Sequence, residues 1–287
     1  MKNPIPAFIT HLKNQGKRPG TWRLYGKILM RLQEHKNTWG PVTGRTTAQI
    51  EDFLSSIGGT GKWRKVNTIA VKNFYRWLHE RGAIPNDPTA EIGTPKVPER
   101  EYLPPTEAEV ARIRAAAGPR IAALLFHLEH TGLRISEALG TRREDVLLDR
   151  VENGKLRPAL LVEGKGGNRI HLPLLNAQHV EWLRRRLRHM EPGDRLFRFT
   201  YSTAWYGIHH AAVRAGVQRV VYDDENRNQY HISPHSLRRF FAKRLVDRGV
   251  PINTVQYLMR HRSVETTAKY ARASEGDAWR QMEAVNG

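Results

Sequence analysis

A proline-rich stretch divides this chain and limits its possible folds more than any other feature. The segment IPNDPTAEIGTPKVPEREYLPP, residues 84–105, contains six prolines. Proline fixes φ and lacks a backbone N–H, so neither a regular helix nor a central strand can run through this segment. We therefore expect residues 91–104 to form an extended linker between a first domain, residues 1–90, and a second domain, residues 105–287. A length of 287 residues suits two domains of ordinary size.

The first domain is predicted to be a small bundle of four helices. PAFITHLKNQ, TWRLYGKILMRLQEH and TTAQIEDFLSSI each place apolar residues at helical spacing. The longer KWRKVNTIAVKNFYRWLHERG is expected to turn Val66, Ile69, Phe74 and Leu78 inward and to end at Gly82.

The second domain is predicted to combine helices with a small amount of sheet. A capping pattern at Thr106 predicts a new helix. ALLVEG and NRIHLPL are β-like runs joined by a glycine-rich turn, which predicts a hairpin. Helical patterns occur before the hairpin, in RIAALLFHLEHTG, and after it, in STAWYGIHHAAVRAG, SPHSLRRFFAKRLVDRG and INTVQYLMRH. The expected fold class is thus mainly α with a small β-sheet.

The chain is strongly basic. Its formal net charge is +19, from 47 Lys and Arg against 28 Asp and Glu, and both domains contribute. Each Lys or Arg placed on a phosphate releases a condensed counterion, so nucleic acid is the expected partner. A membrane surface is disfavoured, because no apolar run has transmembrane length and the start does not resemble a signal peptide. The absence of cysteine excludes disulfides, thiolate zinc sites and cysteine nucleophiles, and it is consistent with a cytoplasmic protein.

Five short stretches of the second domain carry chemically active side chains. In chain order they are TGLRISEAL, EGKGGNR, PHSLRRFFAKRL, LMRHRS and TAKYAR. Each stretch alone is a weak signal, whereas the five in this order form a strong joint signal. Their residues of interest are Arg134, Glu137, Lys165, His235, Arg238, His261 and Tyr270.

On these residues the chain resembles the tyrosine recombinase family, also called the phage integrases, in the two-domain layout of the Xer-type resolvases. The resemblance covers residues 105–272 and, less closely, residues 1–95, which look like the family's helical, SAM-like core-binding domain. It implies a site-specific recombinase that cleaves and rejoins DNA through a 3′-phosphotyrosyl intermediate and a Holliday junction. No metal, ATP or other cofactor is expected. One departure is Arg260, because many members have glycine just before the second histidine.

The residue types suit this chemistry. A phosphodiester under attack gathers negative charge, which the planar forks of Arg134 and Arg238 can hold. Nearby guanidinium groups favour the phenolate of Tyr270, the expected nucleophile. We expect His235 to accept the phenol proton or to bind a phosphate oxygen, and His261 to donate to the same phosphate.

Two further residues complete the expected site. Lys165, on its glycine-flanked turn, suits a general acid that protonates the leaving 5′ oxygen of DNA. Glu137 lies three residues after Arg134 on what we expect to be the same helix, and it is predicted to orient Arg134 or His235. Both have simpler alternatives: Lys165 as a solvated turn residue, and Arg134 with Glu137 as a structural ion pair.

DNA contacts are expected from two helices outside these stretches. KWRK opens the last helix of the first domain, where a basic start suits phosphate or major-groove contact, with plain surface charge as the alternative. STAWYGIHHAAVRAG resembles the helix that the family lays in the major groove. The candidates are Lys62, Arg64, Lys65, Lys72, Thr203 and Tyr206.

The end of the chain offers a candidate oligomer contact. EGDAWRQMEAVN carries Trp279, Met282 and Val285 on one side of a short helix. The resemblance implies that this tail docks into a neighbouring protomer and closes a homotetramer on two DNA duplexes. The alternative is that it folds back on its own domain.

Two other functions remain open at this point. A type IB topoisomerase-like enzyme shares phosphotyrosine chemistry but acts as a monomer, which a docking tail speaks against. A non-catalytic DNA-binding relative is the second alternative, and the complete set of active-site residues speaks against it. A recombinase is expected to act in the cytoplasm, on the nucleoid.

Overall fold

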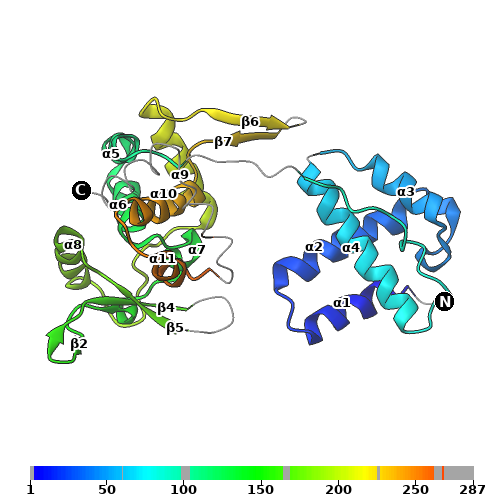
Figure 1. Cartoon of the computed structure of the whole chain (residues 1–287), viewed down its shortest axis with the longest axis horizontal. Coiled ribbons are helices and arrows are strands. Elements are labelled where there is room, and N and C mark those ends of the chain that lie inside the picture. Colours follow the sequence, from blue (N-terminus) through cyan, green and yellow to red (C-terminus); the bar gives the residue numbers. More distant parts are fainter. Residues whose placement is uncertain are drawn as a thin grey trace, which may run out of the picture. The chain divides into compact units, whose positions relative to one another are not determined.

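The structure is a computed structural model that describes residues 3–59, 61–97, 104–163, 169–224, 227–261 and 267. The chain divides into two compact units, Met1–Glu101 with Tyr222–Gln229, and Tyr102–Val221 with Tyr230–Gly287. Most of the described elements are helices, and the strands form three small sheets (Figure 1). The predicted fold class, mainly α with a small sheet, is confirmed.

Four α-helices build the first unit, as the sequence predicted. They are α1 (Ile5–Asn14), α2 (Pro19–Glu34), α3 (Thr47–Ser56) and α4 (Gly61–Glu80), with two short 3₁₀ turns between α2 and α3. α2 begins with Pro19, which has no N–H group to satisfy. At the start of α3, a capping box between Thr46 and Gln49 accepts hydrogen bonds from the first backbone N–H groups. Their apolar faces meet in one buried core, which includes Phe8, Leu29, Ile50 and Phe74.

The inward face of α4 differs in part from the prediction. Phe74 and Leu78 are buried, whereas Val66 and Ile69 are only half-buried. Asn67 is fully buried between them, because its side-chain amide donates to the backbone carbonyl of Trp63 at 2.8 Å. A polar side chain whose amide N–H bonds to a carbonyl of its own helix can enter the core, and an apolar stripe drawn from the sequence does not anticipate this.

In the described part of the second unit, the helices pack around α6. They are α5 (Glu107–Ala116), α6 (Pro119–Thr131), α7 (Ile135–Gly140), α8 (Ala177–Leu187), α9 (Tyr201–Arg214), α10 (Pro234–Asp247) and α11 (Ile252–Met259). Thr106 caps α5 in a capping box with Glu109, as the sequence pattern predicted. The leucines of α6 are fully buried against α5, α9 and α10 in the main core of this unit. None of the described helices is long and apolar enough to span a membrane.

The predicted hairpin is present as β4 (Ala159–Glu163) paired with β5 (Arg169–Pro173), antiparallel, with Leu160 opposite Leu172. A third strand, β1 (Val146–Leu147), pairs with β4 to complete the sheet. Residues 164–168, which include Lys165, lie outside the described residues.

Two further strand pairs were not predicted from the sequence. They are β2 (Val151–Glu152) with β3 (Lys155–Leu156), and β6 (Val220–Asp224) with β7 (Arg227–Tyr230). These runs are very short or largely polar, so they lack the alternation of apolar and polar residues that marks a strand in a sequence.

Candidate active site

The turn between α6 and α7 delivers Arg134. Gly132 ends α6 in the left-handed conformation, and Arg134 then occupies the N-cap of α7 with extended backbone. The carboxylate of Glu137, in the first turn of α7, accepts the backbone N–H of Arg134 at 2.8 Å. Arg134 therefore precedes the helix that carries Glu137, instead of lying on it as the sequence suggested. The negative charge of Glu137 in the first turn of α7 interacts favourably with the positive end of the helix dipole.

Gly132 is required by both its backbone and its surroundings. Its φ is +58°, and a Cβ built at this position would lie 2.2 Å from Cδ1 of Phe241 on α10. The carbonyl of Gly132 accepts a hydrogen bond from Nη1 of Arg238 at 2.6 Å. The close approach of α6 and α10 thus brings the end of one helix to the arginine of the other.

The start of α10 positions His235 and Arg238 one turn apart. Ser233 caps this helix and forms a capping box with Ser236, so the entry of the chain into the helix is fixed. The side chain of His235 keeps an exposed face. Even so, its partial burial, followed by the charges of Arg239 and Arg238, lowers the pKa of His235 to about 4. His235 is therefore neutral at pH 7.

Arg238 is almost completely buried, with 2% of its surface exposed. Nη1 donates to the carbonyl of Gly132 at 2.6 Å, and Nη2 donates to the carbonyl of Met259 at the end of α11. Two helix C-termini, both of which carry a partial negative charge, therefore hold one guanidinium group.

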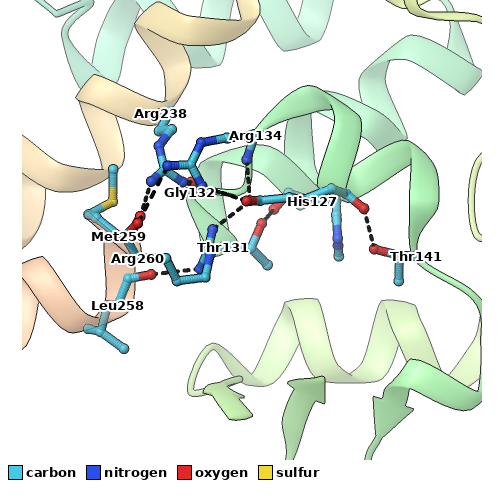
Figure 2. A network of polar contacts seen from close by, with 10 residues as sticks. His127, Thr131, Gly132, Arg134, Thr141, Arg238, Leu258, Met259 and Arg260 are labelled. Atoms are coloured by element: carbon cyan, nitrogen blue, oxygen red, sulfur yellow. Dashed lines mark hydrogen bonds and ion pairs between the residues drawn. The ribbon is translucent and has the colours of Figure 1, made fainter. Parts of the chain in front are cut away.

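Glu137 lies within 4 Å of three arginines, Arg134, Arg238 and Arg260, which are labelled in Figure 2. Its Oε1 accepts from Nη1 of Arg134 at 2.6 Å, and its Oε2 accepts from Nη2 of Arg260 at 2.7 Å. Oε2 also lies 3.9 Å from Nη1 of Arg238. Burial alone would raise the pKa of Glu137, but the charge of Arg260 and the hydrogen bonds from Arg134 and Arg260 outweigh it and lower the pKa. One carboxylate thus faces three guanidinium groups, which leaves the cluster positive.

His261 follows directly after α11. Its backbone N–H donates to the carbonyl of Gln256 at 3.1 Å, and its Nδ1 lies 2.8 Å from Oγ1 of Thr267. Burial and the charges of Arg238 and Arg134 lower the pKa of His261 to about 4. This imidazole is therefore also neutral at pH 7.

The structure thus brings together Arg134, Glu137, Arg238 and His261, with His235 close enough to influence the pKa of His261. Lys165 and Tyr270 lie outside the described residues, as do Trp279, Met282 and Val285. Among the side chains that the structure describes, no three of His, Cys, Asp and Glu are grouped as metal ligands.

The six predicted DNA-contacting residues lie on two helices. Lys62, Arg64 and Lys65 are exposed or partly exposed at the start of α4, whereas Lys72 donates to the carbonyl of Ile92. Thr203 and Tyr206 are exposed near the start of α9. The ring of Tyr206, 57% exposed, stacks on that of His210 with 6.3 Å between centroids.

Arg260 is the residue whose role the sequence did not reveal. It was noted only as a departure from the glycine that many family members have. Its φ of 51° is in the left-handed region, and its guanidinium group reaches Glu137. The sequence did offer a signal, since an arginine stands at a helix end where the backbone is usually left-handed and glycine is common. A non-glycine residue there is strained, so its side chain is expected to make compensating contacts.

Comparisons with known proteins show which family this chain resembles in sequence and fold. The Phage integrase family matches residues 106–276. The tyrosine recombinase XerD of Yersinia pestis is 30% identical over 220 residues, covering 70% of this chain and 68% of XerD. XerD of Lacticaseibacillus casei is 30% identical over 243 residues, 78% of each chain. A crystal structure of a lambda integrase dimer bound to a COC′ core site has a similar fold, with a TM-score of 0.71, 17% identity and 96% of each chain covered.

The chain belongs to the phage integrase family, the tyrosine recombinases. It is accordingly a site-specific recombinase, and the alternatives of a topoisomerase-like enzyme or a non-catalytic relative are not favoured.

Proposed function

We propose that this recombinase cleaves and rejoins duplex DNA with Tyr270 as its nucleophile. The observation that carries the proposal is the positive cluster in which Arg134, Arg238 and Arg260 surround the single carboxylate of Glu137, with the neutral His261 close enough for Arg238 and Arg134 to lower its pKa. The similar lambda integrase was crystallised on a core-site DNA, which supports DNA as the substrate. The cluster suits a phosphodiester, because an attacked phosphate gathers negative charge on its non-bridging oxygens.

The two arginines are suited to different parts of this task. Arg238 is held by two backbone carbonyls and is nearly inaccessible, so it supplies a fixed charge that needs no rearrangement during the reaction. Arg134 has 37% of its side chain exposed and can reach a phosphate oxygen directly. Together they stabilise the charge that develops on the phosphate, and Glu137 orients Arg134.

The histidines are suited to move or share protons at neutral pH. When the hydroxyl of Thr267 donates to Nδ1 of His261, the proton resides on Nε2, which then donates to a phosphate oxygen. Neutral His235 can accept the phenol proton of Tyr270.

In the proposed cleavage step, the oxygen of Tyr270 forms a bond to phosphorus while the bond from phosphorus to the 5′ oxygen breaks. Lys165 donates a proton to the leaving 5′ oxygen. The phosphotyrosyl link conserves the energy of the phosphodiester, so the reverse attack by a 5′ hydroxyl rejoins the strand without ATP or a metal ion. Two rounds of exchange pass through a Holliday junction.

The DNA-contacting residues and the oligomer are parts of the same proposal. The basic start of α4 and the exposed side chains of Thr203 and Tyr206 are available for phosphate and groove contacts. We propose that the duplexes carry a homotetramer, which acts in the cytoplasm on the nucleoid.

A cavity beside α10 supports the tail contact of this tetramer. Its volume is about 350 Å³, and its lining includes Leu172, Leu175, Phe241, Leu245, Leu258, Arg244 and Arg248. The tail of a neighbouring protomer offers Trp279, Met282 and Val285 for the apolar lining, and its sequence EGDAWRQMEAVN supplies acidic side chains for the two arginines.

Covalent trapping tests the proposed nucleophile. The protein is mixed with a pool of randomised duplexes that are nicked, so that a cleaved fragment diffuses away and the reaction cannot reverse. We expect a denaturant-resistant adduct that maps to Tyr270 and is absent in Tyr270→Phe. The matched control is Tyr257→Phe on α11, where 56% of the residue is exposed, and it should form the adduct at the wild-type level. Salt-sensitive binding without any wild-type adduct would contradict cleavage by this chain.

A further inference from the structure

Arg260 has a backbone conformation that L-residues rarely adopt. Its φ and ψ are 51° and 43°, at the C-cap of α11. Among the described residues, the other non-glycine positions with positive φ are Lys36 and Asn153. Both are exposed at turns, whereas 4% of the Arg260 side chain is accessible. Glycine would relieve this backbone, so the arginine side chain is held here at a conformational cost.

The side chain of Arg260 makes two well-formed hydrogen bonds. Nη1 donates to the carbonyl of Leu258 at 2.7 Å, and Nη2 donates to Oε2 of Glu137 at 2.7 Å. The first bond fixes the guanidinium group against the end of α11, and the second carries its orientation to Glu137. The backbone carbonyl of Arg260 also lies 3.5 Å from Nη2 of Arg134.

Occupation of Oε2 determines how Glu137 can hold Arg134. A carboxylate and a guanidinium group prefer a bidentate pair, in which two parallel N–H groups meet two oxygens. Here Oε2 is already shared by Arg260 and the backbone N–H of Arg134, so the Arg134 side chain bonds to Oε1 alone. The remaining N–H groups of the Arg134 fork are then not drawn onto the carboxylate.

We propose that Arg260 is a positioning residue for strand cleavage, which holds Oε2 of Glu137 so that Arg134 keeps donors for the phosphate. This inference rests on the proposed function. Without Arg260, Glu137 can close on Arg134 with both oxygens and withdraw it from the substrate. Glu137 then becomes inhibitory, although it orients Arg134 in the wild-type protein.

The test compares Arg260→Gly with the wild-type protein on the nicked duplexes described above. Glycine suits the left-handed backbone, so the variant should fold. We expect single-turnover cleavage to fall by roughly ten- to a hundredfold, as misplacement of a charge-stabilising group commonly does. DNA affinity should change by less than about threefold, because many phosphate contacts share it. Asn153→Gly is the matched control for a left-handed position outside the site, and its cleavage rate should be unchanged.

Glu137→Gln provides the decisive combination. A neutral amide cannot form the bidentate ion pair, so Glu137→Gln in the Arg260→Gly background should restore cleavage by at least about threefold, although the same change slows the wild-type protein. Guanidinium ion added to Arg260→Gly should also accelerate it, because it can occupy the vacated space beside Oε2. It should not accelerate the wild-type protein or the double variant.

Three results would separate the possibilities. The positioning role would be overturned if Arg260→Gly cleaved at the wild-type rate. It would also be overturned if the rate loss of the double variant equalled the product of the losses of Glu137→Gln and Arg260→Gly. A wild-type protein that forms no adduct would instead remove the proposed function itself. Arg260→Lys adds an independent check, because it keeps the charge but lacks the fork. It should cleave at a rate between those of Arg260→Gly and the wild-type protein.

Discussion

Two helices end at the candidate active site with a left-handed residue, which is a glycine in one helix and an arginine in the other. Gly132 ends α6 with φ 58°, and Arg260 ends α11 with φ 51°. Each end supplies a carbonyl to Arg238, from Gly132 itself and from Met259. At α6 there is no room for a Cβ, so packing demands glycine. At α11 there is room, and a long side chain gives its guanidinium group to Glu137. The same backbone conformation is therefore stabilised by packing at one end and by charge at the other.

The largest effect is expected from Gly132→Ala. The left-handed backbone costs an alanine about 1–2 kcal/mol, and the contact with Phe241 adds about 1–3 kcal/mol of overpacking. Urea unfolding of the full chain should therefore show a loss of roughly 2–5 kcal/mol in the transition of the second unit. The control is Gly154→Ala, where φ is +71° but no atom lies within 4 Å of the new Cβ. Its loss should be limited to the backbone part, and equal losses at the two positions would show that Phe241 moves aside freely.

Much of the fold on either side of this comparison was predictable. Helical spacing identified α6 and α10, and the β-like runs identified the β4–β5 hairpin, because these elements express strong local patterns. The short strand pairs and part of the inward face of α4 were missed. Asn67 enters the core through a hydrogen bond to the backbone of its own helix, which no apolar pattern records, and the strand runs are too short or too polar to show apolar alternation.

The candidate site was predictable as a set of residues but not as a geometry. Motif order singled out Arg134, Glu137, Arg238 and His261, and the structure brings these together. Sequence spacing could not show that Glu137 is shared among three arginines, because Arg260 is 123 residues away from it along the chain. The burial that lowers the histidine pKa values also depends on distant segments and has no local signal.

A smaller effect is expected when Arg260 is replaced. Arg260→Gly loses an ion pair with Glu137, but Glu137 keeps Arg134, and the change relieves backbone strain and repulsion from neighbouring arginines. The free energy of unfolding should therefore stay within about 1–2 kcal/mol of the wild-type value. Arg260→Ala keeps the strain and should be less stable than Arg260→Gly by about 1 kcal/mol. This difference between alanine and glycine isolates the backbone term at α11. The difference in stability between alanine and glycine at position 132 should be larger than that at position 260, because alanine at 132 also clashes with Phe241.

Acid should weaken the protein, because several histidines stay neutral in the fold. Burial lowers the pKa of His127 to about 3 and of His179 to about 2, while His235 and His261 have pKa values of about 4. The unfolded chain takes up these protons near pH 6.5 and the folded chain does not, so stability is present above pH 6.5 and falls as the pH drops toward 4. Glu129 opposes this trend, since burial raises its pKa to about 7 and its contribution is lost as the pH rises from 4.5 to 7. Four groups outweigh one, and the melting temperature should fall from pH 7 to pH 5.

The smallest effect distinguishes the two helix ends by this pH dependence. Gly132→Ala acts through packing, so it should lower the melting temperature by a similar amount at pH 7 and at pH 5. Burial holds the pKa of His261 down most, and the charges of Arg238, Arg134 and Arg260 add to it, so Arg260→Gly removes one of these charges. The pKa of His261 should rise toward its ordinary value, and the loss of stability between pH 7 and pH 5 should become slightly smaller than in the wild-type protein. Glu129→Gln serves as the opposite control, because without its opposing contribution the fall between pH 7 and pH 5 should steepen. Identical pH slopes for Arg260→Gly and Gly132→Ala would mean that charge does not distinguish the end of α11 from the end of α6.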